Sequence, residues 1–339
     1  MKKFIIIALI IGFASACTKS SIRYEQPGEI SFRPVTAKTT KAAISGTEYP
    51  KDDAHNFNVW AWWGDVRAGT PIDDFPAVAD MYLNKREFEY KVFENKVGNS
   101  WGGKDTLYFW PTRGSLVFAG YSPANAKAQN FSYSWSDKTM TIYAYEQPVD
   151  ISQTPDLMWF DLTATSYSDY EGDGVPVEFK HLLSWLTFKF QKKSGASSDY
   201  IVTDVKLKHI ETKARFTSRP ASGSEEWTDH TDPSTVPIWS GEKSITTEAI
   251  MLESTSSGGG VLIIPQHCTA EHVELEIQYK TSAGSDPQTK SAYLTAGTDG
   301  YTWKPGKHYT YTITFGDNEI LVLPEVNDWE TVTVDIEVQ

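Results

Sequence analysis

The chain has 339 residues but only two cysteines, Cys17 and Cys268. So small a number excludes a disulfide framework and a cysteine-based zinc site. If Cys17 carries a lipid, Cys268 has no partner. We therefore expect Cys268 to behave as a small buried apolar residue.

Positive charge is also scarce. The formal net charge is −13 at pH 7, and loss of Lys2 and Lys3 with an export signal would make it −15. Nucleic acids and anionic lipid surfaces are bound through cationic patches. The charge balance therefore argues against both as partners, and we expect no binding to nucleic acid.

The usual sequence markers of catalysis are missing. The chain contains no Gly-x-Ser-x-Gly elbow, phosphate-binding Walker loop or dinucleotide fingerprint, and no two of its seven histidines are four residues apart. Asp169, Glu171 and Asp173 alternate, but the segment lacks a full calcium loop and is better interpreted as a solvated acidic stretch. A carboxylate pair for glycoside hydrolysis is defined by distance in space, so this alternative stays open. We expect no enzymatic activity and no cofactor.

Long apolar runs are absent except at the N-terminus. Lys2 and Lys3 precede an apolar stretch from Phe4 to Phe13, followed by Ala14, Ser15 and Ala16. This stretch is too short to span a bilayer, which needs about 20 apolar residues, and it predicts a signal peptide over residues 1–16. Small residues before Cys17 resemble the lipobox of bacterial lipoproteins, in which the cysteine is acylated. The alternative is an ordinary signal peptide followed by a chance cysteine.

Alternation with period two recurs along the chain, whereas no convincing helical run exceeds about two turns. The pattern is typical of strands with one buried face. It occurs at residues 57–63, 131–142, 186–190, 273–279, 309–315 and 332–338. Short strands separated by Gly, Pro, Ser and Asp predict an all-β chain of antiparallel sandwiches. A polar stretch at 166–174 is the candidate linker, which predicts an N-terminal sandwich over 24–170 and a C-terminal one over 171–339.

Trp60, Trp62 and Trp63 lie so close together that at least one must point away from a single core. An exposed pair at Trp60 and Trp62 could contact a glycan. The interpretation that we favour is that Trp60 and Trp62 cover a second packed face or a domain interface.

Eight segments are informative when they are taken in order. They are Phe57–Ala61, Tyr108–Pro111, Leu116–Pro123, Asp156–Met158, Phe179–Phe188, Ile264–Gln266, Trp303–Tyr309 and Val326–Trp329. No single segment is specific, but in their joint order they resemble the fimbrillin superfamily of Bacteroidetes pilus subunits and especially its fimbrillin-like lipoproteins.

The resemblance implies two tandem transthyretin-like β-sandwich domains, a lipoprotein precursor carried to the outer membrane, and no enzymatic activity. In polymerising members a trypsin-like protease removes the first strand, and a strand from another subunit fills the groove. In this chain the lipidated N-terminal segment would span 17–46 and carry a removable strand at 29–35. Cleavage would follow Lys41 or Lys38, and the donor would be the terminal strand 331–339, with Val332, Val334, Ile336 and Val338 on one face.

The expected partners are other fimbrial subunits, of the same or a related kind, joined by strand exchange. The lipid would tie the chain to the outer membrane, and a surface glycan or protein is a further expected ligand. The alternative is a non-polymerising, glycan-binding or adhesive lipoprotein of the outer membrane. A stalk, an anchor and a tip role are all compatible with the sequence.

Overall fold

The computed structural model describes most of the chain between residues 28 and 328. The described ranges are 28–36, 49–92, 100–126, 130–170, 174–218, 226–252, 260–268, 272–282, 284–297, 300–317 and 320–328. The signal peptide 1–16, Cys17, Lys38, Lys41 and the terminal segment 331–339 with Val332, Val334, Ile336 and Val338 lie outside these residues.

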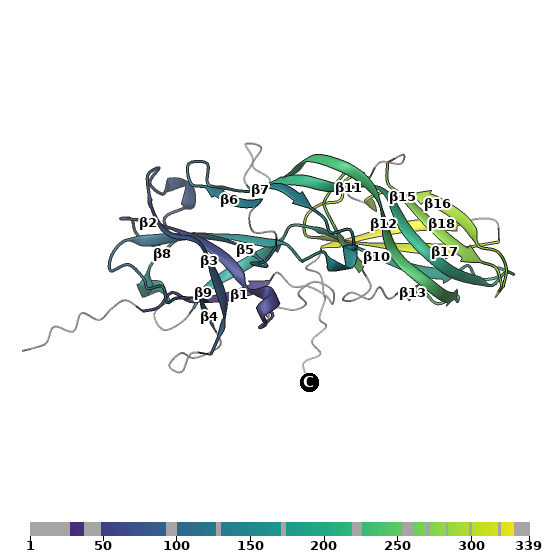
Figure 1. Cartoon of the computed structure of the whole chain (residues 1–339), viewed down its shortest axis with the longest axis horizontal. Coiled ribbons are helices and arrows are strands. Elements are labelled where there is room, and N and C mark those ends of the chain that lie inside the picture. Colours follow the sequence, from purple (N-terminus) through teal and green to yellow (C-terminus); the bar gives the residue numbers. More distant parts are fainter. Residues whose placement is uncertain are drawn as a thin grey trace, which may run out of the picture.

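The described part of the chain is all-β, as the alternation predicted. Its helical elements are short 3-10 turns, among them Asp53–His55, Ile72–Asp74, Ile151–Gln153 and Tyr167–Asp169. Within the described ranges, no helix has the length and apolar character needed to cross a membrane. The molecule is elongated, with β1 to β5, β8 and β9 at one end and β10 to β18 at the other (Figure 1).

Seven strands at the N-terminal end form a closed sheet in the order β1-β4-β3-β2-β5-β8-β9. They are β1 (Phe32–Thr36), β2 (Phe57–Gly64), β3 (Asp80–Lys91), β4 (Ser100–Gly103), β5 (Ser115–Ser122), β8 (Met158–Thr165) and β9 (Val175–His181). Closure gives every strand two neighbours and leaves no free edge. The interior is packed with aromatic and aliphatic side chains contributed by all seven strands.

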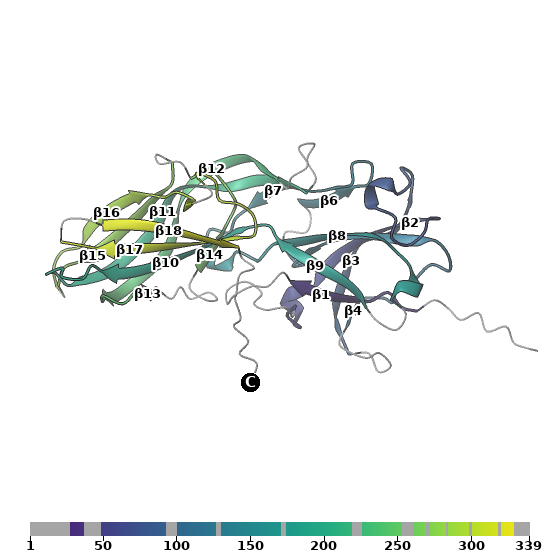
Figure 2. The same cartoon turned by 180° about the vertical axis from the view of Figure 1, so that it is seen from behind.

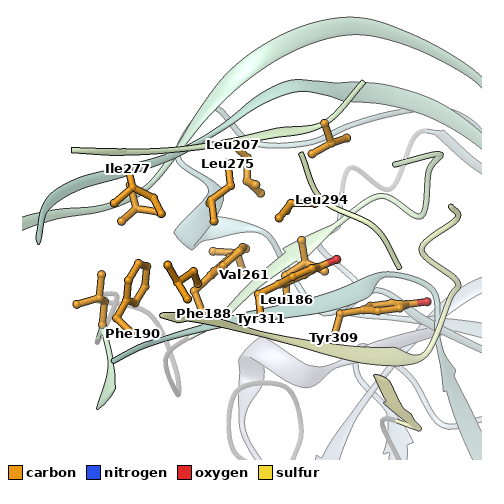
Figure 3. Packing of buried hydrophobic residues seen from close by; sticks show 14 of the residues in the cluster. Leu186, Phe188, Phe190, Leu207, Val261, Leu275, Ile277, Leu294, Tyr309 and Tyr311 are labelled. Atoms are coloured by element: carbon orange, nitrogen blue, oxygen red, sulfur yellow. The ribbon is translucent and has the colours of Figure 1, made fainter. Parts of the chain in front are cut away.

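The remaining strands form a five-stranded sheet at the C-terminal end and a six-stranded sheet that extends from it toward the closed sheet. The first contains β13 (Ile250–Met251), β10 (Ser184–Lys192), β17 (Lys307–Phe315) and β18 (Ile320–Asp328) in this order, with β14 (Gly260–Ile263) also on β10. The second runs β16 (Gln288–Tyr293), β15 (Glu274–Lys280), β11 (Tyr200–Thr217), β7 (Thr139–Glu146) and β6 (Phe131–Ser134), with β12 (Glu226–Ile245) on β11. Leu207 and Leu275 of one sheet face Leu186, Phe188 and Tyr311 of the other (Figure 3).

The prediction of purely antiparallel pairing was wrong at two places. β1 runs parallel to β9, and β10 runs parallel to β17. Side chains alternate with period two in both kinds of strand, so alternation cannot distinguish parallel from antiparallel neighbours. The sequence pattern also contains no sign that the first sheet closes on itself.

The long hairpin of β11 and β12 joins the two ends of the molecule. Ile201 to Lys208 of β11 pair with β15, whereas Lys213 to Thr217 pair with β7. β7 belongs to a hairpin with β6 whose side chains pack on the outside of the closed sheet. One continuous sheet therefore spans both ends. β9 also lies beyond the boundary predicted at 170/171, yet it pairs with β1 and β8 of the closed sheet.

Cys268 is completely buried in the core between the two C-terminal sheets, as expected for a small apolar residue. Burial raises the pKa of its thiol to about 12, so the reactive thiolate is scarce at neutral pH.

Candidate assembly interface

β1 occupies the closing position of the first sheet, between β9 and β4. Its five residues pair in parallel with β9, from Phe32 opposite Val175 to Thr36 opposite Phe179. On its other side Phe32 is opposite Trp101 of β4. β1 and β9 run side by side in the view from behind (Figure 2). The segment predicted as a removable strand, residues 29–35, is therefore a strand whose removal would open the closed sheet.

Ile30 and Phe32 are completely buried, as predicted. The alternation is incomplete, because Ser31 between them is also buried at 2% exposed, whereas Arg33 is exposed. The Phe32 ring lies edge-on to three other rings, with centroid distances of 4.9 Å to Phe88, 5.2 Å to Phe118 and 5.8 Å to Phe57. Edge-to-face pairs add to the stabilisation that burial alone provides. Phe32 therefore fills the centre of an aromatic core.

Backbone hydrogen bonds fix the residues just before β1. The Ile30 amide donates to the Tyr108 carbonyl at 2.7 Å, and the Trp110 amide donates to the Gly28 carbonyl at 3.1 Å. The Val175 amide donates to the Ser31 carbonyl at 2.7 Å. Removal of residues 28–36 would leave these groups of the closed sheet without their partners.

Gly174 lets the chain before β9 approach β1 closely. A Cβ atom at this position would lie 2.9 Å from the carbonyl carbon of Phe32, closer than real Cβ atoms approach backbone. The Arg33 Nε donates to the Gly174 carbonyl at 2.9 Å on the same side. Glycine is thus the residue that permits this contact.

Without β1, the closed sheet would present two strand edges and an apolar groove. The groove would be lined by side chains that Phe32 and Ile30 now cover, among them Phe57, Phe88, Trp101 and Phe118. An extended segment with alternating apolar residues satisfies such a groove through both its backbone and its side chains. Chemically, the arrangement is suited to accept a strand.

Trp60 and Trp62 are placed elsewhere, and the idea that they form an exposed glycan platform is wrong for this structure. They are 4% and 1% exposed. The hairpin of β6 and β7 covers them, with the Trp62 ring centroid 4.4 Å from that of Tyr133 and 4.8 Å from that of Trp135. The interpretation of a second packed face is confirmed. Alternation revealed the hairpin, but it could not reveal what the hairpin covers.

The described residues contain no group of three or more His, Cys, Asp and Glu side chains able to hold a metal ion. His181 is a buried histidine, and its Nδ1 lies 2.9 Å from Oδ1 of Asp156. Asp169, of the acidic stretch, accepts hydrogen bonds from the backbone and hydroxyl of Ser166 and so closes a local turn.

Comparison with known proteins identifies the family to which the chain is similar. A family model described as fimbrillin-like matches residues 40–329. A fimbrial protein from Bacteroides vulgatus has a similar structure, with a TM-score of 0.55 and 15% identity over 89% of this chain and 100% of that one. Candidate cell adhesion proteins from Bacteroides uniformis and Bacteroides ovatus give TM-scores of 0.53 and 0.52 at 16% and 15% identity, over 89% of this chain and 98% of each of theirs. At such identities the likeness shows the fold alone. No curated protein matches the chain in a sequence search.

Proposed function

The chain belongs to the fimbrillin-like family, and from this premise we propose that it is a cell-surface fimbrial subunit or accessory anchor or tip component that assembles by strand exchange. The observation that carries the proposal is the position of β1, which closes the first sheet and fills its aromatic core with Phe32. A fimbrial role is structural, so it requires neither a catalytic centre nor a cofactor.

In the proposed pathway the chain is exported as a lipoprotein acylated at Cys17 and reaches the outer membrane. A protease then cuts after Lys38 or Lys41. Both lysines lie in sequence between Thr36, where β1 ends, and Tyr49, the next residue that the structure describes. A cut at either site removes the covalent link between β1 and the rest of the closed sheet, so that β1 is held by non-covalent contacts alone.

The donor proposed to replace β1 is the terminal strand 331–339 of another subunit. Val332, Val334, Ile336 and Val338 alternate with polar residues, as Ile30, Phe32 and Pro34 do in the strand to be replaced. Strand addition of this kind gains backbone hydrogen bonds from the two neighbouring strands and apolar burial from the side chains. It joins subunits without any new covalent bond.

We also propose that the two ends of the molecule are the two tandem transthyretin-like domains expected of the family. Pairing of β9 with β1 and β8 favours a division at Leu182 and Leu183, between β9 and β10. The β11–β12 hairpin would then act as a brace between the domains, because its sheet includes strands from both ends.

Substitution of both cleavage sites tests the polymerising role in cells. A Lys38→Gln, Lys41→Gln chain should reach the surface yet be missing from fimbrial polymers, because β1 would stay in its groove. Immunoblots of sheared surface material, read as the ratio of multimer to monomer, measure this. The matched control is Lys51→Gln, an exposed lysine beyond the cleavage segment, which should polymerise normally. If the wild type, the double variant and Lys51→Gln all polymerise equally, cleavage occurs at another site. If none of the three polymerises, the alternative of a non-polymerising adhesive lipoprotein is favoured.

A further inference from the structure

A surface pocket lies at the end of the molecule remote from β10 to β18. Its volume is about 340 Å³, and it is lined by Trp63, Asp80, Tyr82, Pro111, Thr112 and Arg113. These residues come from the end of β2, the start of β3 and the loop before β5. In Figure 1 this is the end where β2 finishes and β5 begins.

Register explains why Trp63 takes part in this pocket and its neighbours do not. Trp62 points to the outer face beneath the β6–β7 hairpin, and the next residue along the strand points the other way. Trp63 is opposite Asp80 in the β2–β3 ladder, where β2 ends and β3 begins. Trp63 is therefore only partly covered, and it stands beside an exposed carboxylate.

The aromatic walls are held in place by hydrogen bonds. The Trp63 Nε1 donates to the Arg113 carbonyl at 2.8 Å, and the Arg113 guanidinium carbon lies 5.8 Å from the Trp63 ring centroid. The Tyr82 hydroxyl donates to the Phe109 carbonyl at 2.5 Å. Walls fixed before a ligand arrives reduce the entropy lost on binding.

The pocket combines aromatic surface with hydrogen-bonding groups, and a sugar ring uses both. Trp63 and Tyr82 supply aromatic area that matches the C–H face of a sugar ring. Asp80 supplies hydrogen-bond acceptors and Arg113 supplies donors, which suits hydroxyl groups because each hydroxyl both donates and accepts. Since the two side chains carry opposite charges, their sum favours an uncharged ligand over an anion or a cation.

The volume of the pocket limits the size of the ligand that it can hold. Small-molecule sites usually measure roughly 300–1,000 Å³, so this pocket is at the lower end and suits a single ring better than a long ligand. We infer that the pocket formed by Trp63, Asp80, Tyr82 and Arg113 binds one neutral monosaccharide unit of a glycan. The inference concerns the uncleaved chain and does not depend on strand exchange.

Binding of the purified full chain to an oligosaccharide array tests this inference. The array should carry chains ending in uncharged hexoses and N-acetylhexosamines, together with chains ending in sialic or uronic acids. We expect binding to at least one uncharged terminus. Asp80→Ala and Arg113→Ala should each weaken it by about tenfold, because each removes hydrogen bonds to the ligand. Both side chains are exposed, so the variants should melt at the wild-type temperature.

The control variant is Arg215→Ala. The Arg215 guanidinium carbon also lies close to an aromatic ring, 5.1 Å from the Tyr143 centroid, but this pair does not line the pocket. Binding should therefore be unchanged in Arg215→Ala. An array without any bound uncharged terminus would overturn the inference, as would equal affinities of wild type, Asp80→Ala and Arg113→Ala. Neither result bears on polymerisation, which the Lys38 and Lys41 variants test separately.

Discussion

Replacement of Phe32 by alanine is expected to lower the free energy of unfolding of the uncleaved protein by about 3–5 kcal/mol, the range for truncating a buried phenylalanine. Phe32 is completely buried and packs edge-on against Phe57, Phe88 and Phe118. Alanine would leave a cavity at the centre of the closed sheet, where backbone pairing on both sides of β1 limits collapse. Chemical denaturation followed by tryptophan fluorescence measures the change.

The matched control is Phe109→Ala, the same substitution at a residue whose backbone is opposite Glu29 but whose side chain is 41% exposed. Its effect should stay within about 1 kcal/mol, because little apolar area is lost from a core. Similar losses in both variants would contradict the central place that the structure gives to Phe32.

A cut between β1 and Tyr49 is expected to convert a groove that is closed to added peptides into one that accepts them. A specific protease site inserted after Lys41 allows the chain to fold with β1 in place before it is cut. A labelled peptide of residues 329–339 should then bind the cut protein and displace the N-terminal fragment, while the uncut protein should not bind it. Fluorescence anisotropy measures binding, and mass spectrometry identifies the fragment released.

Two further peptides make this experiment decisive. A peptide of residues 28–36 should bind the cut protein, because it is the strand that the groove holds in the structure. A 329–339 peptide with Val334→Asp and Ile336→Asp should bind at least about tenfold more weakly, since it would bury unpaired charge. If residues 28–36 bind and 329–339 do not, the groove is exchangeable and the proposed donor is wrong. If neither binds, strand exchange at this groove is contradicted.

The strand content of this protein was predictable because alternation reflects burial on one face of a strand. The segments at 57–63, 131–142, 186–190 and 309–315 are β2, the β6–β7 hairpin, β10 and β17. β12 was not recognisable, because it is an outer strand with many exposed residues and with Pro233 and Pro237 in its interior. Proline is tolerated in such strands, yet it removes the sequence signal.

Only part of the candidate interface was predictable from the sequence. Alternation of Ile30 and Phe32 indicated a buried face, whereas the parallel pairing with β9 and the close approach at Gly174 depend on residues some 140 positions away. The pocket could not be predicted at all. Trp63, Tyr82 and Arg113 come from three separate segments, and only the β2–β3 pairing and the loop before β5 bring them together.

The most direct test of strand exchange is the N-terminus of the protein within assembled fimbriae. Mass spectrometry of subunits from purified surface polymers should find an N-terminus just after Lys38 or Lys41, with no peptide from residues 28–36 still joined to the chain. Unassembled precursor in the same cells should begin at an acylated Cys17. Polymers whose subunits all retain acylated Cys17 and an intact β1 would contradict the proposed exchange.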